Sequence, residues 1–362
     1  MKRKIRDIST LVNKKIDSNQ LNKNTYISTE NMLPNFCGVT IASSVPPGNV
    51  NSFSEGDTLL SNIRPYFKKI WLANFNGGCS NDVLVIRSNT TVLNKYLFYS
   101  LNNDKFIRYY VASCKGTKMP RGNKDALLEW EIDIPSIAEQ QHIVNTIGSV
   151  DDLIENYQEK INKICTILSI SLRKYDGKVA IEYYEPKIIK SGVIKFDKTK
   201  IYADTSTIEG INNMSDGEII TSSKRPSRAN MQPIKNSVWF AKMKGSNKKL
   251  IITDNDSDLI NNYILSTGYL GVEASSKLPL SLLSAIIISD DFNEQRDLNS
   301  VGTTMAGVNN ETFLKIIVPK LDNNEIKEYN NKYSPLIKEL SLLRMKINEL
   351  KIIKSKLLDK YF

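Results

Sequence analysis

The sequence predicts an α+β protein in which one module occurs twice, each copy being a mixed domain followed by a long helix. Three observations predict this class. Two stretches match at a constant shift, each match ends in a long helical pattern, and short strand patterns alternate with turn residues upstream. The chain has 362 residues, of which 41% are hydrophobic. It is therefore long enough for two domains of roughly 100–200 residues.

The internal match appears when the chain is shifted by 186 residues. Residues 160–175 (KINKICTILSISLRKY) and 346–361 (KINELKIIKSKLLDKY) share eight of sixteen positions. Residues 116–128 and 302–314 share five of thirteen, and each of these segments opens with Gly-Thr. Strand patterns ending in proline follow at 130–135 and 315–319, where a shift of 184 indicates a small insertion or deletion. Several matches in the same order indicate duplication.

Two long helices are predicted to close the two copies. In residues 136–175 apolar side chains recur every three to four positions, and Ser136 with Glu139 forms a capping-box pattern. The second pattern covers residues 324–362 and contains Pro335, which we expect to kink or interrupt the helix. About 36 helical residues span roughly 54 Å. Two ordinary core helices are the alternative, but the matched lengths favour an antiparallel coiled coil related by a pseudo-twofold axis.

The regions before the helices are predicted to be mixed domains. Strand patterns occur at residues 82–87, 237–241 and 250–253, with glycine, proline and asparagine turns between them. Helical patterns at 95–108 and 280–296 precede the two Gly-Thr loops. The predicted organisation is a first domain at 1–135, a helix at 136–176, a second domain at 177–319 and a helix at 320–362.

Positive charge is shared between the two halves of the chain. The net charge is +10, with 22 Lys and Arg against 17 Asp and Glu in residues 1–176, and 27 against 22 in the remainder. Segments without any carboxylate lie at 58–81, 105–124 and 219–253. Lys and Arg neutralise phosphates, and Arg, Asn and Gln can contact base edges, so these segments favour DNA binding over an ordinary solvated lysine-rich face.

Residues that carry chemistry are scarce. The sequence has no phosphate-binding GxxxxGK[ST] loop, and its four cysteines and one histidine, His142, are too scattered for a zinc site. The run at residues 285–289 is too short to cross a membrane, and no apolar segment follows the basic start as in a secretory signal. We therefore expect a cytoplasmic, non-catalytic protein with reduced thiols and no cofactor or metal of its own.

The whole chain resembles the specificity (S) subunit of type I restriction–modification systems. The resemblance rests on residues 56–74 (GDTLLSNIRPYFKKIWLAN), 115–147, 225–243 (RPSRANMQPIKNSVWFAKM) and 263–273 (YILSTGYLGVE). It implies two target-recognition domains that each read half of a bipartite, asymmetric site in double-stranded DNA, with the two helices as a ruler. It also implies two docked methyltransferase subunits using S-adenosylmethionine for adenine methylation, and two restriction subunits using ATP and Mg²⁺.

The resemblance and the charge pattern together give the candidate DNA-contacting residues. The resemblance implies Ser61, Asn62, Arg64, Lys115, Lys118 and Arg121 in the first domain, and Arg225, Ser227, Arg228, Asn230 and Gln232 in the second. The basic segments add Lys68, Lys69, Lys224, Lys242 and Lys244. Two alternatives stay open: a coiled-coil scaffold whose basic loops bind acidic proteins without reading DNA sequence, and a stand-alone DNA enzyme.

Overall fold

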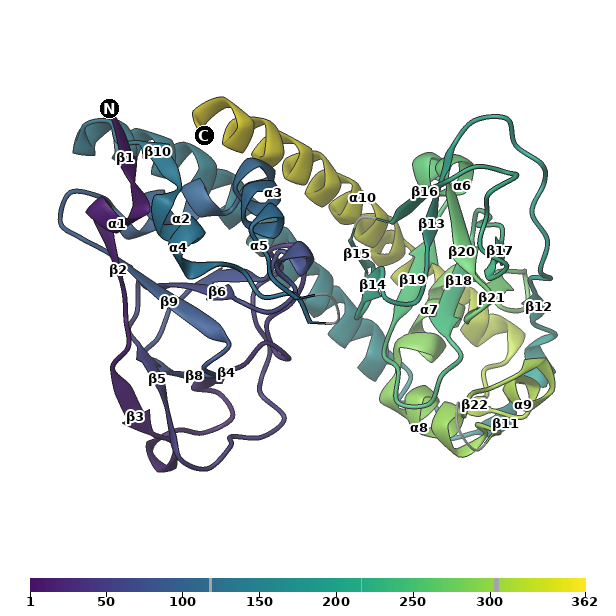
Figure 1. Ribbon diagram of the computed structural model, residues 1–362. Coiled ribbons are helices and arrows are strands. Elements are labelled where there is room, and N and C mark those ends of the chain that lie inside the picture. The colour runs from purple at the N-terminus through teal and green to yellow at the C-terminus, as the bar shows by residue number, and fades with distance from the viewer. Residues whose placement is uncertain (117–118, 216, 303–305) are drawn as a thin grey trace. The chain divides into compact units, whose positions relative to one another are not determined.

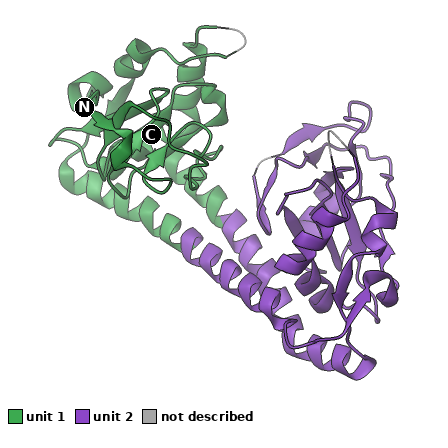
Figure 2. Cartoon of the chain, turned by 90° about the horizontal axis from the view of Figure 1, so that it is seen from below, with its two compact units in different colours: residues 1–153, 350–362 green, residues 154–349 purple. Residues whose placement is uncertain are grey.

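The computed structural model describes residues 1–116, 119–215, 217–302 and 306–362, and it confirms the α+β class (Figure 1). The chain divides into two compact units (Figure 2). Unit 1 is Met1–Leu153 with Leu350–Phe362, and unit 2 is Ile154–Glu349. The two long helices, α5 (Ile137–Ser171) and α10 (Asn323–Tyr361), therefore each contribute residues to both units.

Unit 1 contains two four-stranded sheets, in the orders β2-β9-β6-β7 and β3-β5-β8-β4, and a two-stranded sheet β1-β10. Its pairs are antiparallel except β4 with β8. The elements before α5 are β1 (Lys2–Lys4), α1 (Ile5–Ile8), β2 (Ser9–Leu11), β3 (Lys15–Asp17), η1 (Ser18–Gln20), β4 (Tyr26–Ile27), β5 (Asn49–Phe53), β6 (Thr58–Ser61), η2 (Pro65–Phe67), β7 (Ile70–Leu72), β8 (Gly77–Cys79), β9 (Val83–Ser88), α2 (Asn94–Leu101), α3 (Asp104–Ala112), α4 (Lys124–Glu129) and β10 (Glu131–Asp133).

Unit 2 has sheets in the orders β12-β21-β18-β19 and β16-β13-β20-β17, with two-stranded sheets β11-β22 and β14-β15. Here the parallel pair is β13 with β20. The elements between the long helices are β11 (Lys178–Ala180), η3 (Ile181–Tyr184), β12 (Lys187–Ile188), β13 (Lys200–Ala203), β14 (Ile208–Glu209), β15 (Asn213–Met214), β16 (Glu218–Ile220), β17 (Ala229–Met231), β18 (Ser237–Ala241), β19 (Lys249–Ile252), α6 (Ser257–Asn262), β20 (Tyr263–Ser266), β21 (Tyr269–Glu273), α7 (Leu280–Ile288), α8 (Asp290–Leu298), α9 (Asn310–Leu314) and β22 (Ile317–Pro319).

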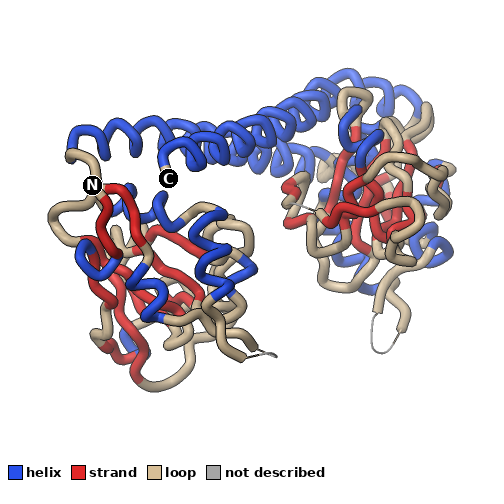
Figure 3. The backbone as a smooth tube through the Cα atoms, turned by 45° about the horizontal axis from the view of Figure 1, so that its top comes forward, coloured by secondary structure: helices blue, strands red, loops and turns tan. Residues whose placement is uncertain are grey.

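The two units repeat one element order, mixing helices with short strands as Figure 3 shows. Helices α2, α3, α4 and α5 begin 186 residues before α7, α8, α9 and α10, respectively. Strands β10 and β22 keep the shift of 186. Asp133, the last residue of β10, pairs with Lys2, and the equivalent last residue of β22, Pro319, pairs with Lys178. The shift of 184 expected from the prolines is therefore wrong, because Pro135 lies two residues beyond the counterpart of Pro319.

Buried strands and one buried helix form the core of unit 2. All five residues of β18 (SVWFA) are buried, and α7 (LSLLSAIII) is buried at all but its first residue. Burying a large side chain such as Trp239 or Phe240 stabilises a fold by roughly 1.5–3 kcal/mol. This core fixes the hairpin β18–β19, whose turn carries several of the predicted basic residues.

The long helices differ from expectation at one point. Helix α10 runs through Pro335 without interruption, so the predicted interruption is wrong. Proline removes a single N–H donor from the helical ladder, while Tyr333 and Ile337 on either side are buried and hold both turns against the core. At the other helix, the Ser136 hydroxyl accepts the Glu139 N–H at 3.3 Å, which is one of the two bonds of the predicted capping box.

Within unit 2 the two helical segments pack against each other. The hydroxyls of Ser171 and Tyr329 are in contact, and the Lys346 Nζ lies 5.5 Å from the ring centre of Tyr157. Ser171 follows Tyr157 in α5, whereas its partner Tyr329 precedes Lys346 in α10. The two segments therefore run antiparallel. Among the residues that the structure describes, no helix has the length and apolar character needed to cross a membrane.

Candidate nucleic-acid interface

In each unit the turn of a central hairpin is joined to a Gly-Thr loop. In unit 1 Ile63, between β6 and β7, pairs with Arg121, which also pairs with Lys115. In unit 2 Met243 pairs with Gly307, which also pairs with Val301. We call residues 62–69 with 115, 116 and 119–121 hairpin surface 1, and residues 242–248 with 301, 302, 306 and 307 hairpin surface 2. Hairpin surface 1 thus brings together two basic segments that are far apart in the sequence, whereas the basic residues of hairpin surface 2 all come from residues 242–248.

The cations of hairpin surface 1 differ in their partners. Arg121 pairs with Asp82 (Nη2 to Oδ1, 3.0 Å), and Lys68 pairs with Asp104 (Nζ to Oδ1, 2.7 Å). Arg64 and Lys115 are exposed, and neither has a carboxylate partner among the described residues. These two charges are therefore available to a ligand. The predicted residue Lys118 lies outside the residues that the structure describes.

Three predicted residues of this region have partners inside the protein. Ser61 is 2% exposed and donates to the Ile63 carbonyl at 3.1 Å. Asn62 is 8% exposed, and its Oδ1 accepts the Tyr110 hydroxyl at 2.6 Å. The Lys69 ammonium donates to the Thr29 carbonyl at 2.6 Å, and burial lowers the pKa of this group. These side chains hold the hairpin in place, and in this conformation Ser61 and Asn62 are not accessible to DNA.

Strained backbone is concentrated beside hairpin surface 1. Of the seven described non-glycine residues with positive φ, four are here: Asn35, Phe36, Arg64 and Lys68. The N–H groups of Asn35 and Phe36 donate to the carbonyls of Phe67 and Lys68, both at 2.9 Å. A non-glycine residue with positive φ costs roughly 1–3 kcal/mol of folding free energy. Such residues tend to occur at functional sites. The local backbone is thus strained where the exposed cations gather.

Unit 2 contains a basic cleft beside hairpin surface 2. The cleft has a volume of about 370 Å³ and no carboxylate in its lining. Its charged residues are Arg228, Lys242 and Lys248, and its hydroxyls come from Thr205, Ser206, Ser246 and Thr267. Lys248 donates to the Thr205 carbonyl at 2.8 Å and lies 3.6 Å from the Glu209 carboxylate. Sequence reasoning found the lysines and the arginine but missed Thr205, Ser206 and Thr267, which only the folded sheet brings to the cleft.

Two cations of this basic cleft lack a counter-charge. Arg228 is exposed and Lys242 is half-buried, and the described part of the chain supplies neither with an ion pair. Burial lowers the pKa of the Lys242 ammonium, because removing a charge from water disfavours it. An anion placed between these cations would offset that penalty, so the cleft is suited to a phosphate group.

The other predicted residues of unit 2 lie outside the cleft. Lys224, Ser227 and Lys244 are exposed. Arg225 donates to the Ala229 carbonyl and, at 2.9 Å, to Asn230 Oδ1, so this pair stabilises its own loop. The side-chain amide of Gln232 donates to the Ile260 carbonyl at 3.0 Å, and the side-chain oxygen Oε1 of Gln232 is buried. The structure thus brings Arg228 and Lys242 together but directs Gln232 into the fold.

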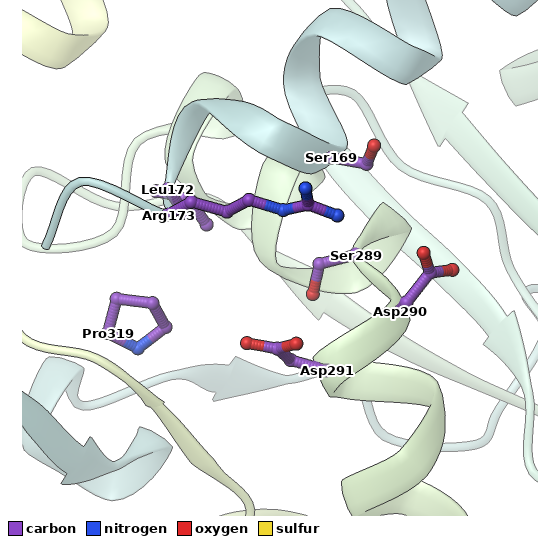
Figure 4. A pocket seen from close by; sticks show the side chains of 7 residues that line it. All are labelled: Ser169, Leu172, Arg173, Ser289, Asp290, Asp291 and Pro319. Atoms are coloured by element: carbon purple, nitrogen blue, oxygen red, sulfur yellow. The ribbon is translucent and has the colours of Figure 1, made fainter. Parts of the chain in front are cut away.

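A small recess of unit 2 has a different character (Figure 4). Arg173, two residues beyond the end of α5, faces Asp290 and Asp291 at the start of α8, with Ser169, Leu172, Ser289 and Pro319 around them. Its volume is about 20 Å³, enough for a water molecule but not for an organic substrate. Among the described residues, no group of three or more His, Cys, Asp or Glu is arranged to hold a metal ion. The basic surfaces therefore remain the strongest candidate site.

Comparison with known proteins identifies similar chains. Residues 1–166 match the family model described as the type I restriction modification DNA specificity domain. The specificity subunit of the type I restriction enzyme EcoDI from Escherichia coli is 27% identical over 112 residues, which are 31% of this chain and 25% of that protein. The HindI specificity subunit from Haemophilus influenzae is 27% identical over 158 residues, or 41% of this chain and 34% of that protein. The matches thus span a quarter to a third of these relatives.

Solved structures resemble the chain over its whole length. The type I restriction–modification S subunit from M. genitalium covers 100% of this chain and 96% of its own, with 16% identity and a TM-score of 0.48. The HsdS subunit from Thermoanaerobacter tengcongensis has the same coverages, 14% identity and a TM-score of 0.38.

Proposed function

We propose that this chain selects the DNA site of a type I complex, because residues 1–166 match the type I restriction modification DNA specificity domain, in line with the resemblance seen in the sequence. In this role it binds double-stranded DNA sequence-specifically and leaves the chemistry to other subunits. The observation that carries the proposal is the basic hairpin surface that recurs in both units. Lysine and arginine side chains at such a surface neutralise phosphates and give salt-sensitive binding.

Each unit is proposed to read its own half of a bipartite site. Both hairpin surfaces share one backbone pattern, in which the hairpin turn pairs with the Gly-Thr loop. Their side chains differ, since Arg64 and Lys115 mark the first surface and Lys242 and Arg228 mark the second with its cleft. Two different sets of side chains on one frame recognise two different half-sites, so the target is asymmetric. The recognition domains are taken as residues 1–135 and 177–319.

The helices α5 and α10 are proposed to form an antiparallel coiled coil that sets the distance between the half-sites. Half-sites read on one face of B-DNA lie about 34–36 Å apart, which helices of this length can span. The helices have a second proposed role, the docking of two methyltransferase subunits and of restriction subunits in the cytoplasm. Exposed apolar side chains on both helices support this role. They are Leu153, Ile167 and Ile170 on α5, and Leu342, Met345, Ile352 and Ile353 on α10. Those subunits would bring S-adenosylmethionine for adenine methylation, and ATP with Mg²⁺ for restriction.

Methylation mapping tests the proposal directly. We expect a bipartite methylated motif in cells that carry this chain with its methyltransferase subunit, and no such motif when the chain is deleted. The variant R64A/K115A should relax the first half of the motif, and R228A/K242A should relax the second. Matched controls are Lys2→Ala in β1 and Lys187→Ala in β12, both exposed lysines outside the hairpin surfaces.

A motif that does not change on deletion would contradict the proposal. It would favour the coiled-coil scaffold, whose basic loops bind acidic proteins instead of DNA sequence. If R64A/K115A altered both halves of the motif equally, the assignment of one half-site to each unit would be wrong.

A further inference from the structure

Two adjacent aromatic side chains are exposed on hairpin surface 1. Tyr66 and Phe67 are 47% and 40% exposed, and their ring centres lie 4.7 Å apart. A pair of large aromatic rings on a basic surface is costly to leave in water, because each ring carries a large apolar area. Such exposure indicates that the rings meet a partner.

The turn that carries these rings is rigid. Residues 65–67 form the short η2 turn, with Arg64 and Lys68 on either side in the left-handed conformation. Within the turn, the N–H groups of Phe67 and Lys68 donate to the carbonyls of Arg64 and Pro65 at 3.0 and 2.9 Å. Bonds from residues 35 and 36 to the carbonyls of residues 67 and 68 brace it from the other side. The rings are thus presented on a fixed base that resists displacement.

Positive charge surrounds the ring pair. Arg64, Lys68 and Lys69 flank it, and the Lys69 Nζ lies 5.8 Å from the ring centre of Phe67. No carboxylate occurs in residues 58–81, and Asp104, which pairs with Lys68, is supplied by α3. A cationic rim around flat apolar rings complements nucleic acid, which has phosphates outside and flat bases inside. An acidic protein would match the rim but would offer no flat stack for the rings.

We propose that Tyr66 and Phe67 form an aromatic wedge that stacks against a base step of the first half-site and partly unstacks it. This inference rests on the proposed function, because it assumes that unit 1 meets duplex DNA. Side chains that insert between base steps are apolar or aromatic, and neighbouring cations hold the flanking phosphates. The wedge would add selectivity for base steps that unstack easily, beyond any hydrogen bond to a base edge.

Unit 2 supplies an internal control. At the corresponding turn of hairpin surface 2 the sequence is Met243-Lys244-Gly245-Ser246-Asn247, with no aromatic residue. The distortion is therefore confined to the first half-site. This asymmetry separates a wedge from a general bending of DNA by a basic protein, which would affect both half-sites.

The test uses the full-length chain assembled with its methyltransferase subunit, and duplexes that carry the motif found by methylation mapping. 2-Aminopurine is placed in turn at each step of both half-sites that does not include the methylated adenine, since its fluorescence rises when it unstacks and a methyltransferase itself flips its target base out of the stack. We expect a several-fold rise at one step of the first half-site and none in the second. The variant Y66S/F67S should abolish the rise, whereas Tyr66→Phe and Phe67→Trp, which keep the rings, should retain it.

Each other outcome overturns the wedge. If the wild-type complex methylates its motif but shows no rise at any step, or if Y66S/F67S keeps the rise, the rings do not unstack DNA and the proposed function still stands. If the complex neither binds nor methylates a specific motif, both the wedge and the proposed function fail. Because both rings are exposed, a thermal melt of Y66S/F67S should match that of the wild type and exclude misfolding.

Discussion

The guanidinium of Arg344 forms a buried ion pair with the carboxylate of Asp256, with Nη2 and Oδ1 2.6 Å apart and both side chains at most 3% exposed. Ser341 also donates to this carboxylate at 2.8 Å, and Arg344 donates to the Ile251 carbonyl of β19 at 2.8 Å. These bonds fasten α10 to the strand that carries hairpin surface 2. The orientation of hairpin surface 2 within unit 2 is thus set by a polar contact in its core.

Loss of Arg344 should strongly destabilise unit 2. Removing one partner of a buried pair leaves an uncompensated charge and costs about 3–5 kcal/mol. We therefore expect Arg344→Met to lower the free energy of unfolding of unit 2 by that amount, measured by urea denaturation. The double variant D256L/R344M should recover much of it, because neither charge remains. Lys163→Met, which breaks the exposed pair of Lys163 with Glu159, should have little effect. Equal losses in all three variants would contradict a special role for the buried pair.

The same pair should make unit 2 sensitive to acid. Burial raises the pKa of Asp256, but the charge of Arg344 and the hydrogen bonds from Thr253 and Ser341 outweigh it, so the pKa lies below the ordinary 3.8. The stabilisation is therefore fully present above about pH 4 and is lost as the pH falls through the lowered pKa. Urea midpoints between pH 2 and 6 should show this loss in the wild type and a smaller one in Asp256→Asn. A variant curve parallel to the wild type would assign the acid loss to other carboxylates.

A buried lysine should make the stability of unit 2 depend on pH above neutrality as well. Burial and the charge of Arg296 lower the pKa of the Lys249 ammonium from 10.5 to about 7. Between these values the unfolded chain binds more protons than the folded one, so stability rises with pH across this window. Lys249→Met should remove the rise and stabilise unit 2 at neutral pH by about 1–4 kcal/mol. Lys244→Met, an exposed lysine of the same hairpin, is the matched control, and a retained rise in Lys249→Met would refute the assignment.

Local signals in the sequence located most elements, and the errors have identifiable causes. The helix predicted at 95–108 is divided into α2 and α3, because the Asn103 side chain accepts the Phe106 N–H at 3.0 Å and starts a new helix. The helix predicted at 280–296 is divided in the same way by Ser289, which accepts the Phe292 N–H at 3.1 Å. Asn and Ser are common N-cap residues. Here the helical spacing of apolar residues continues past Asn103 and Ser289, so the sequence pattern did not reveal the two helix boundaries.

The candidate site was less accessible to sequence reasoning than the fold. The cleft joins Thr205, Arg228, Lys242 and Thr267 through strand pairings that no local pattern specifies. Tyr66 and Phe67 gave no signal, since aromatic residues next to a strand are usually part of a core. The left-handed turn was hidden as well, because Arg64 and Lys68 occupy positions where glycine would have marked it.

The cations of the basic cleft should each contribute to the salt dependence of DNA binding. If Lys242 contacts a backbone phosphate, Lys242→Met should change the salt dependence of binding. The slope of the logarithm of the association constant against the logarithm of the salt concentration should become less negative by about 0.9. Arg228→Met should do the same, whereas the distant Lys187→Met should leave the slope unchanged. Fluorescence anisotropy of a labelled duplex between about 50 and 200 mM salt measures these slopes. Equal slopes in all variants would show that the cleft does not hold a phosphate.

Pro335 offers a test of what α10 contributes beyond its length. The helix passes through this residue although proline supplies no N–H to the carbonyl of Asn331, one turn earlier. Pro335→Ala restores that donor and should stabilise unit 2 by about 1–3 kcal/mol in urea denaturation. Because Tyr333 and Ile337 already hold the helix on both sides of the proline, its course should not change. The methylated motif should therefore keep its spacer length in this variant. A motif with an altered spacer would instead show that a bend at Pro335 helps to set the distance between the half-sites.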